Sequence, residues 1–210
     1  MLYLTPHADL FLMKTKITKI TDKKIVGKAV SVLEKGGLIV YPTETLYGLG
    51  ADATNDKAVR KLLTIKKRNP SKKMSIAFRD IRMAKKYLIV TAKAANLAKA
   101  FMPGPLSLEL ETKSTPRRKA GLRIPDNKTI LKIIRKLDRP ITSTSANISG
   151  KENSYKIREI IRLFDGKVDM IIDAGNMPKR KASTVYDPLE GKILREGPIS
   201  KKQIDAALKP

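Results

Sequence analysis

Short apolar runs that end in glycine- and hydroxyl-rich segments constrain the fold of this chain most strongly. Apolar side chains repeat with helical spacing from Ile25 to Leu33, and Gly36 and Gly37 end that pattern. A short buried strand is predicted directly afterwards, over residues 38–41. The next segment, residues 42–50, is dense in hydroxyl groups and glycine, so we expect it to leave the strand as a loop of defined shape.

The alternation of helical and extended patterns continues along the chain. A second helix is predicted from a cap near Asn55 or Asp56 to a basic end that precedes Asn69 and Pro70. Leucines alternate with polar residues over 106–110, which predicts a strand with one exposed face. Further helices are predicted over residues 80–87, 91–101, 129–137, 154–164 (with Ser154 as its cap) and from 200 onward, and further strands over 75–78, 121–124, 140–143, 168–173, 183–186 and 192–195.

Strands and helices alternate irregularly, so the sequence predicts an α/β (α+β) fold with one large twisted mixed β-sheet flanked by helices. At 210 residues the chain is long enough to bury a full core as one domain. We expect residues 14–210 to form it and residues 1–13 to be an N-terminal extension, because Met13 is a plausible alternative start. The first residues do not resemble a secretory signal and no apolar tract could span a bilayer, which predicts a cytoplasmic protein without a membrane partner.

The charge balance favours phosphate-bearing partners. Lysine and arginine number 44 against 20 acidic residues, which gives a net charge of +24. Such a field attracts polyanions, whether tRNA, double-stranded RNA or a nucleoside triphosphate, in a salt-dependent way. An evenly solvated, lysine-rich surface is the alternative interpretation. Aromatic residues make up only 5% of the chain, so base-stacking platforms are poorly supplied.

The residue inventory excludes several kinds of chemistry. The chain has no cysteine, which rules out disulfides, thiolate zinc sites and cysteine nucleophiles, and His7 is its single histidine. No glycine segment ends in the Gly-Lys-Ser/Thr of a Walker A loop. What remains is positioning and electrostatics: binding ATP and a small acid, and aligning an oxyanion for attack on the α-phosphorus.

Three polar segments at predicted strand or helix ends are candidates for such a site: residues 43–45 (Thr-Glu-Thr), residues 66–68 with Lys72 and Lys73, and residues 143–147 (Ser-Thr-Ser-Ala-Asn). Each has a structural alternative. The threonines could hydrogen-bond their own turn, the basic cluster could oppose the helix dipole, and the third segment could cap a turn.

Taken together, six motifs in order resemble the YrdC-like threonylcarbamoyladenylate synthases, over about residues 17–197. The motifs are Tyr-Pro-Thr-Glu-Thr-Leu-Tyr-Gly-Leu-Gly at 41–50, Lys-x-Arg at 66–68, Pro-Gly-Pro at 103–105, Gly-Leu-Arg-Ile-Pro at 121–125, Ser-Ala-Asn at 145–147 and Ser-Thr-Val at 183–185.

The resemblance implies a YrdC-like fold and a nucleotidyltransferase that makes L-threonylcarbamoyladenylate from L-threonine, bicarbonate and ATP, with Mg²⁺ accompanying the triphosphate and pyrophosphate released. A separate threonylcarbamoyl transferase acting on tRNA would consume the product. The chain resembles the short form of the family, without the additional C-terminal domain of some relatives.

By motif position, the resemblance also implies the site residues. The threonine side would be formed by Thr45, Arg123, Ser143 and Ser183, with Arg123 pairing the carboxylate. The nucleotide side would be formed by Lys66, Arg68, Lys72, Lys119, Ser145, Asn153 and Arg195. The recurrent catalytic group of the family maps to Lys66, Arg68, Ser145 and Asn147.

Two positions depart from the family pattern: Asn69 stands before Pro70, and Ala77 or Phe78 replaces a histidine common in relatives. Two rival functions remain open at this point. One is a related carbamoyltransferase that also forms a carbamoyl-adenylate, and the other is an RNA-binding module without catalysis, motivated by the net charge.

Overall fold

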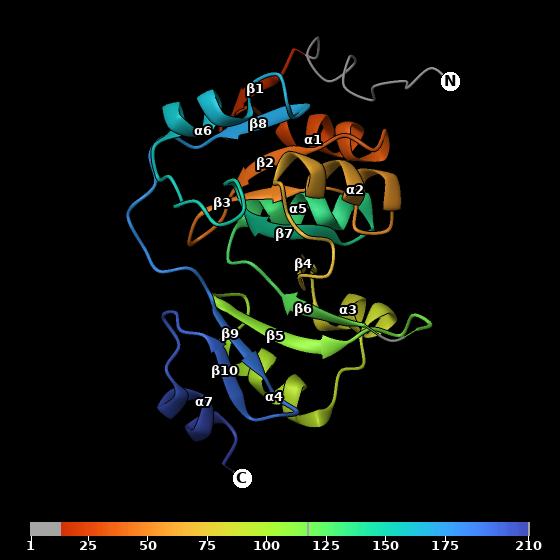
Figure 1. Ribbon diagram of the computed structural model, residues 1–210, viewed down its shortest axis with the longest axis vertical. Helices are drawn as coiled ribbons and strands as arrows, with labels where there is room; N and C mark the ends of the chain where they lie inside the picture. Colours follow the sequence, from red (N-terminus) through yellow and green to blue (C-terminus); the bar gives the residue numbers. More distant parts are fainter. Residues whose placement is uncertain (1–13, 117, 210) are drawn as a thin grey trace, which may run out of the picture.

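One ten-stranded mixed sheet organises the chain (Figure 1). The computed structural model describes residues 14–116 and 118–209, so the expected extension at residues 1–13 lies outside the described range. The strands are β1 (Lys16–Lys19), β2 (Ile39–Pro42), β3 (Tyr47–Gly50), β4 (Ser75–Ala77), β5 (Leu106–Glu111), β6 (Lys119–Arg123), β7 (Ile141–Ser145), β8 (Met170–Asp173), β9 (Thr184–Asp187) and β10 (Lys192–Arg195).

The strand order is β1-β8-β2-β3-β7-β4-β6-β5-β9-β10. Parallel pairs such as β4 with β6 occur beside antiparallel pairs such as β4 with β7. The predicted mixed sheet is therefore confirmed. The helices of the described residues are α1 (Ile25–Glu34), α2 (Asp56–Ile65), α3 (Ile81–Tyr87), α4 (Ala92–Phe101), α5 (Lys128–Leu137), α6 (Ile157–Phe164) and α7 (Lys201–Ala207).

Local sequence explains where the helices begin. The Asn55 side chain accepts hydrogen bonds from the backbone of Lys57 and Ala58 and so caps α2. Ser200 and Gln203 form a capping box at α7. The predicted cap of α6 is wrong: its N-cap is Lys156, without a side-chain hydrogen bond, because the Ser154 hydroxyl instead binds the Glu159 carboxylate at 2.6 Å.

Two apolar clusters hold the layers together. The larger one combines the inner faces of α1, α3, α4, α5 and α7 with the sheet, and the smaller one combines α2 and α6 with β2, β3 and β8. In Figure 1, β1, β8, β2, β3 and β7 form the upper half with α1, α2, α5 and α6, while β6, β5, β9 and β10 form the lower half with α3, α4 and α7. The short strand β4 joins the two halves through its pairing with β7 and β6.

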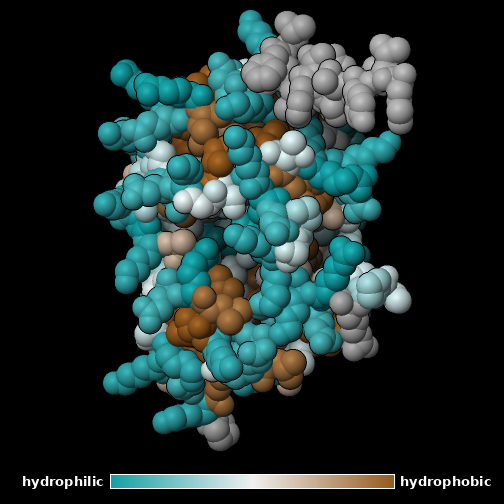
Figure 2. Space-filling model, in the orientation of Figure 1, coloured by the Kyte–Doolittle hydropathy of each residue, from teal (hydrophilic) through white to brown (hydrophobic). Residues whose placement is uncertain are grey.

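Hydrophilic side chains cover most of the face seen in Figure 2. Across the described part of the chain, every helix is too short or too polar to cross a membrane.

The loop expected over residues 42–50 is partly wrong, because Tyr47–Gly50 is strand β3 and pairs with β2 and β7. The buried ring of Tyr41 explains the glycines there. A Cβ atom on Gly50 would lie 2.7 Å from the ring, and one on Gly48 would lie 2.9 Å from it. Glycine therefore marks a close approach of side chain to strand and not an end of the strand.

The exposed face expected for the strand at 106–110 is also wrong, since the first five residues of β5 are all buried. Its leucines, Leu106, Leu108 and Leu110, belong to the larger apolar cluster. The alternate residues Ser107 and Glu109 are buried as well. Alternation along this strand thus separates two buried environments, one apolar and one polar.

Replacing Gly50 with alanine should destabilise the fold, because the new methyl group would press on the Tyr41 ring at 2.7 Å. We expect the free energy of unfolding to fall by about 1–3 kcal/mol, as for other overpacked cores. Urea denaturation of Gly50→Ala against the parent chain measures the difference.

Gly27→Ala is the matched control. Gly27 lies inside α1, and a Cβ atom there would have its nearest neighbour, the Lys136 ammonium, at 3.7 Å. This substitution should raise the free energy of unfolding by up to about 1 kcal/mol, the difference in helix propensity. Equal effects of both substitutions would show that the Tyr41 contact does not determine the choice of glycine.

Candidate active site

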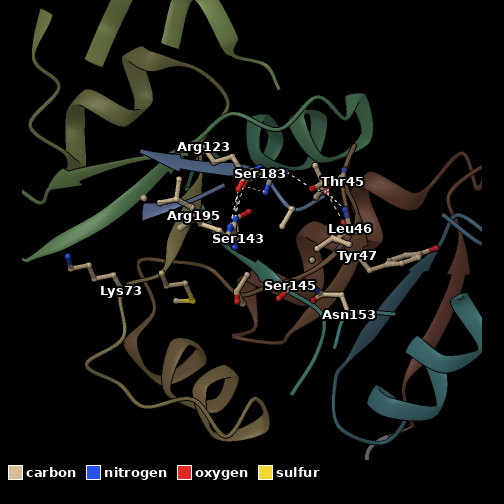
Figure 3. A pocket seen from close by; sticks show the side chains of 18 of the residues that line it. Thr45, Leu46, Tyr47, Lys73, Arg123, Ser143, Ser145, Asn153, Ser183 and Arg195 are labelled. Atoms are coloured by element: carbon tan, nitrogen blue, oxygen red, sulfur yellow. Dashed lines mark hydrogen bonds between the residues drawn. The ribbon is translucent and has the colours of Figure 1, made fainter. Parts of the chain in front are cut away.

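A polar cavity of about 200 Å³ lies where segments from both halves of the sheet meet (Figure 3). Eight of the twelve residues proposed from the sequence line it: Thr45, Arg68, Arg123, Ser143, Ser145, Asn153, Ser183 and Arg195. They come from segments as far apart as the β2–β3 loop and β10. The structure therefore brings most of the sequence-derived candidates to one place.

Arg123, at the end of β6, is the centre of one end of the cavity. Its Nη2 donates to the Thr45 hydroxyl at 2.9 Å and to the Glu44 carboxylate at 2.8 Å. Its Nη1 donates to the Ser183 hydroxyl at 3.3 Å. The guanidinium thus links the β2–β3 loop to the segment before β9 and is held in one orientation.

The β2–β3 loop serves both of the purposes considered for it. The Thr43 hydroxyl accepts from the backbone N–H groups of Thr45 and Leu46 and donates to the Leu46 carbonyl at 2.7 Å, so Thr43 closes the turn. Thr45 is left to bind Arg123. Both threonines line the cavity, but the Thr43 hydroxyl is engaged in the turn, whereas the Thr45 hydroxyl binds Arg123.

Arg195 approaches the same serine from β10. Its guanidinium donates to the Ser183 carbonyl at 3.0 and 2.7 Å and to the Ser183 hydroxyl at 3.0 Å. The residue as a whole is exposed, yet partial shielding of the guanidinium from water and the nearby charge of Arg123 lower the pKa of Arg195. Two guanidinium groups that share one serine create a strongly positive site, suited to anions.

Lys66 is buried directly behind Ser145 and does not line the cavity. Its ammonium donates to the Ser145 carbonyl at 2.5 Å, to the Asn147 carbonyl at 2.8 Å and to the Asn147 side chain at 3.0 Å. Burial, and secondarily the charge of Arg68, lower the pKa of Lys66 to about 8. At neutral pH it therefore remains an ammonium whose three N–H groups fix the segment that carries Ser145.

Asn147 completes this arrangement. Its side-chain oxygen accepts from the Ser145 hydroxyl at 2.8 Å as well as from Lys66, and its side-chain nitrogen donates to the Lys151 carbonyl. Like Lys66, Asn147 lies outside the cavity lining. Both residues hold Ser145 in place in this structure.

Arg68 reaches the cavity from the segment after α2, and its Nη2 donates to the Lys73 carbonyl at 2.6 Å. Burial lowers the pKa of its guanidinium. The Asn69 side chain, one of the two departures from the family pattern, accepts from the backbone and hydroxyl of Ser71 at 2.9 and 2.8 Å. Asn69 therefore shapes the turn that follows Arg68.

The second departure, at Ala77 or Phe78, supplies no polar side chain to the cavity. Ala77 and Phe78 are fully buried in the larger apolar cluster, and neither lines the cavity.

Lys72 and Lys119 lie elsewhere. Both line a neighbouring groove between α2, residues 70–74 and the start of β6, and not the cavity. The Lys119 ammonium is 2.7 Å from the Asp187 carboxylate, a hydrogen bond that raises the pKa of Lys119. Their assignment to the nucleotide remains a prediction from motif position.

Sequence reasoning missed two polar residues at the site, Ser107 and Glu109, and it named Glu44 and Lys73 only as members of candidate segments. Lys73 and Glu109 line the cavity, Glu44 pairs with Arg123, and the Ser107 hydroxyl lies 3.2 Å from that of Ser183. The signal for Ser107 and Glu109 is the alternation in β5, which predicts solvent-facing polar positions but here marks a polar face that is buried.

Unpaired polar atoms gather at this cavity. Six buried side-chain atoms lack a hydrogen-bond partner among the described residues, and four of them belong to the cavity-lining residues Arg68, Glu109, Arg123 and Asn153. A fifth is Glu44 Oε2, on the side chain that binds Arg123. Because buried polar groups in native proteins are nearly always satisfied, such a cluster is typical of a ligand site.

Comparison with known proteins agrees with this geometry. The Sua5/YciO/YrdC family model, described as "Telomere recombination", matches residues 31–197. A Methanocaldococcus jannaschii protein provisionally named as a threonylcarbamoyl-AMP synthase is 38% identical over 201 residues, 89% of this chain and 95% of that protein. The Bacillus subtilis threonylcarbamoyl-AMP synthase is 34% identical over 90% of this chain and 58% of that protein.

A solved structure of the same family is also similar to this chain. The crystal structure of P. abyssi Sua5 complexed with L-threonine is 31% identical, with a TM-score of 0.82 over 94% of this chain and 61% of that one. The chain thus spans less than two thirds of the B. subtilis and P. abyssi proteins but nearly all of the M. jannaschii protein. Since the family model covers most of its length, the chain belongs to the Sua5/YciO/YrdC family.

Proposed function

We propose that this chain is an L-threonylcarbamoyladenylate synthase, a nucleotidyltransferase that uses ATP, L-threonine and bicarbonate and releases pyrophosphate. The observation that carries the proposal is the convergence of Arg68, Arg123 and Arg195 with several hydroxyl groups in one cavity that also gathers unpaired polar atoms. Relatives named as threonylcarbamoyl-AMP synthases and a threonine-bound Sua5 structure support it.

The amino acid would bind at the end of the cavity formed by Arg123. A guanidinium held by Glu44, Thr45 and Ser183 is fixed in one orientation towards a carboxylate, and its Nε has no partner among the described residues. Charge-assisted pairing of this kind orients a small acid strongly. The Ser143 hydroxyl, which also lines the cavity, would complete this side.

The phosphates of ATP would lie against Arg68 and Arg195, with Ser145 and Asn153 as further contacts. Lys66 and Asn147 would act by holding Ser145, as their hydrogen bonds in this structure do. Lys72 and Lys119 would reach the nucleotide only where its phosphates extend towards their groove.

Mg²⁺ would arrive with the triphosphate. No group of three or more acidic, histidine or cysteine side chains that could hold a metal occurs within residues 14–116 and 118–209. The site therefore fits a hard ion that is bound mainly by phosphate oxygens and water. Such an ion would neutralise charge at the phosphates.

The reaction needs little covalent participation by the protein. The amine of threonine forms a bond to the carbon of bicarbonate-derived CO₂ and loses a proton. An oxygen of the resulting carbamate then attacks the α-phosphorus, and the bond from that phosphorus to the pyrophosphate oxygen breaks. Fixed cations that stabilise the charge developing on the phosphates are the main catalytic contribution we assign to the site.

The product carries an activated threonylcarbamoyl group. We propose that a separate transferase consumes it to modify tRNA, in the cytoplasm. Direct binding of tRNA or double-stranded RNA to the basic surface is a further hypothesis that the net charge of +24 motivates.

One assay tests the proposal. The purified chain, incubated with ATP, Mg²⁺, bicarbonate and L-threonine, should release pyrophosphate and form an adenylylated threonine carbamate detectable by mass spectrometry. Product formation with carbamoyl phosphate but not with threonine would indicate the related carbamoyltransferase. Salt-sensitive RNA binding without turnover of ATP would indicate a binding module.

Arg123→Ala should raise the KM for L-threonine much more than the KM for ATP. The substitution removes the guanidinium that we assign to the carboxylate, a hydrogen bond to a charged group worth about 1.5–3 kcal/mol, or roughly 10- to 100-fold in affinity. Steady-state kinetics with each substrate varied in turn measures the two values. Equal increases in both would contradict this assignment of Arg123.

The affinity for ATP should fall as the pH rises through about 8, the pKa of Lys66. Deprotonation leaves two N–H groups for three acceptors, which loosens the segment that carries Ser145. Titration calorimetry with ATP and Mg²⁺ at pH 7 and pH 9 measures the effect, and Lys66→Met should bind weakly at both. Constant affinity of the parent chain up to pH 9 would refute the prediction.

The free energy of unfolding should rise with pH, whereas the affinity for ATP should fall. The pKa of Lys66 in the folded chain, about 8, is lower than the ordinary value of 10.5, so the unfolded chain binds this proton more tightly. The contribution of Lys66 to the free energy of unfolding therefore rises between about pH 8 and pH 10.5. A fall of ATP affinity over this range cannot then be attributed to a loss of folding caused by Lys66.

A further inference from the structure

Glu109 is a buried carboxylate in a cavity otherwise suited to anions. It lies in β5, is 5% exposed, and lines the cavity together with three arginines. Among the described residues, it is the one acidic side chain in the cavity lining. A carboxylate would repel phosphate groups, so its presence needs a separate explanation.

The partner of Glu109 within the protein satisfies it incompletely. The Lys73 ammonium donates to Oε2 at 3.0 Å and lies 2.5 Å from Oε1, but outside hydrogen-bonding geometry for that atom. The Lys73 side chain is 55% exposed, whereas that of Glu109 is 4% exposed. A buried carboxylate whose hydrogen-bond partner among the described residues is a largely exposed lysine retains the capacity to accept further hydrogen bonds.

The position of this pair suggests which part of a nucleotide lies beside it. In Figure 3, Lys73 lies at the end of the cavity away from Thr45, with Arg195 and Ser145 between them. If threonine binds near Thr45 and the phosphates bind near Arg195 and Ser145, the nucleoside extends towards Lys73 and Glu109. The groups of a nucleoside that donate hydrogen bonds to a carboxylate are the ribose hydroxyls and the amine of the base.

We propose that Glu109 accepts hydrogen bonds from the 2′- and 3′-hydroxyls of the ribose and so selects ribonucleotides. The inference rests on the proposed function, because it assumes that the cavity binds ATP. A carboxylate has two oxygens that match two adjacent hydroxyl donors, the arrangement by which acidic residues bind ribose in other nucleotide sites. A role as a metal ligand fits less well, since Glu109 belongs to no group of three or more potential metal ligands among the described residues.

Binding of ATP, 2′-deoxy-ATP and 3′-deoxy-ATP, each with Mg²⁺, tests the proposal by titration calorimetry without turnover. The parent chain should bind each deoxy analogue roughly 10- to 100-fold more weakly than ATP, as expected for the loss of a hydrogen bond to a charged group. Glu109→Gln, which keeps the shape of the side chain, should reduce this preference to about threefold or less.

Lys73→Ala is the matched control, because it breaks the same salt bridge but leaves the carboxylate in place. This variant should keep the preference for ribose. If Lys73→Ala loses the preference as completely as Glu109→Gln, the salt bridge and not the carboxylate is responsible, and the proposal is wrong.

Three other outcomes would also overturn it. A parent chain that binds ATP and 2′-deoxy-ATP equally well has no ribose contact at Glu109, whatever the variants do. A preference for ATP over inosine triphosphate that Glu109→Gln abolishes, with the ribose preference intact, would assign the carboxylate to the base amine. Failure of the parent chain to bind any nucleotide would refute the proposed function as well, which distinguishes it from the first two results.

Discussion

The site depends on the hydrogen bonds of one buried guanidinium. Arg123 binds Thr45, 78 residues away in the sequence, and Ser183, 60 residues away. These bonds connect the β2–β3 loop of the upper half of the sheet to the segment that enters β9 in the lower half. The sheet already joins the two halves through β4, and these bonds fix the side chains assigned to threonine against one another.

The same arrangement carries an electrostatic cost. Arg68, Arg123 and Arg195 line one cavity, and partial burial lowers the pKa of Arg68 and Arg195. Like charges brought together in a partly dehydrated space repel each other more strongly than in water. A bound polyanion would relieve that repulsion and satisfy the unpaired nitrogens of Arg68 and Arg123. The arrangement of charges therefore favours ligands with several negative charges.

Local patterns in the sequence were sufficient to predict most elements of the fold. The helix α5 follows from its spacing of Ile130, Ile133, Ile134 and Leu137 and α2 from the cap at Asn55. Prediction failed where a contact with a residue distant in the sequence, and not the local pattern, determines the structure. The glycines of β3 indicated a loop because the ring of Tyr41, which occupies the space beside them, is not visible in a local pattern.

The candidate site shows the same division. Motifs identified Arg68, Arg123 and Ser145, which do line one cavity. No local signal distinguishes the buried Lys66, which holds the Ser145 segment, from the cavity-lining Arg68 two residues later. Glu109 was missed because alternation in a strand does not say whether the polar face meets solvent or a cavity. Only the position of β5 in the sheet decides that.

The mixed sheet explains how strand starts and strand ends both come to line the cavity. Because β4 is antiparallel to β7 and parallel to β6, the C-terminal end of β7 lies beside the N-terminal ends of β4 and β6. The N-terminal end of β3 reaches the same edge, since Gly48 pairs with Ser145. In an all-parallel sheet a ligand edge receives only carboxyl ends of strands. Here the starts of β3 and β4 (Gly48 and Ser75) and the ends of β6 and β7 (Arg123 and Ser145) all line one cavity.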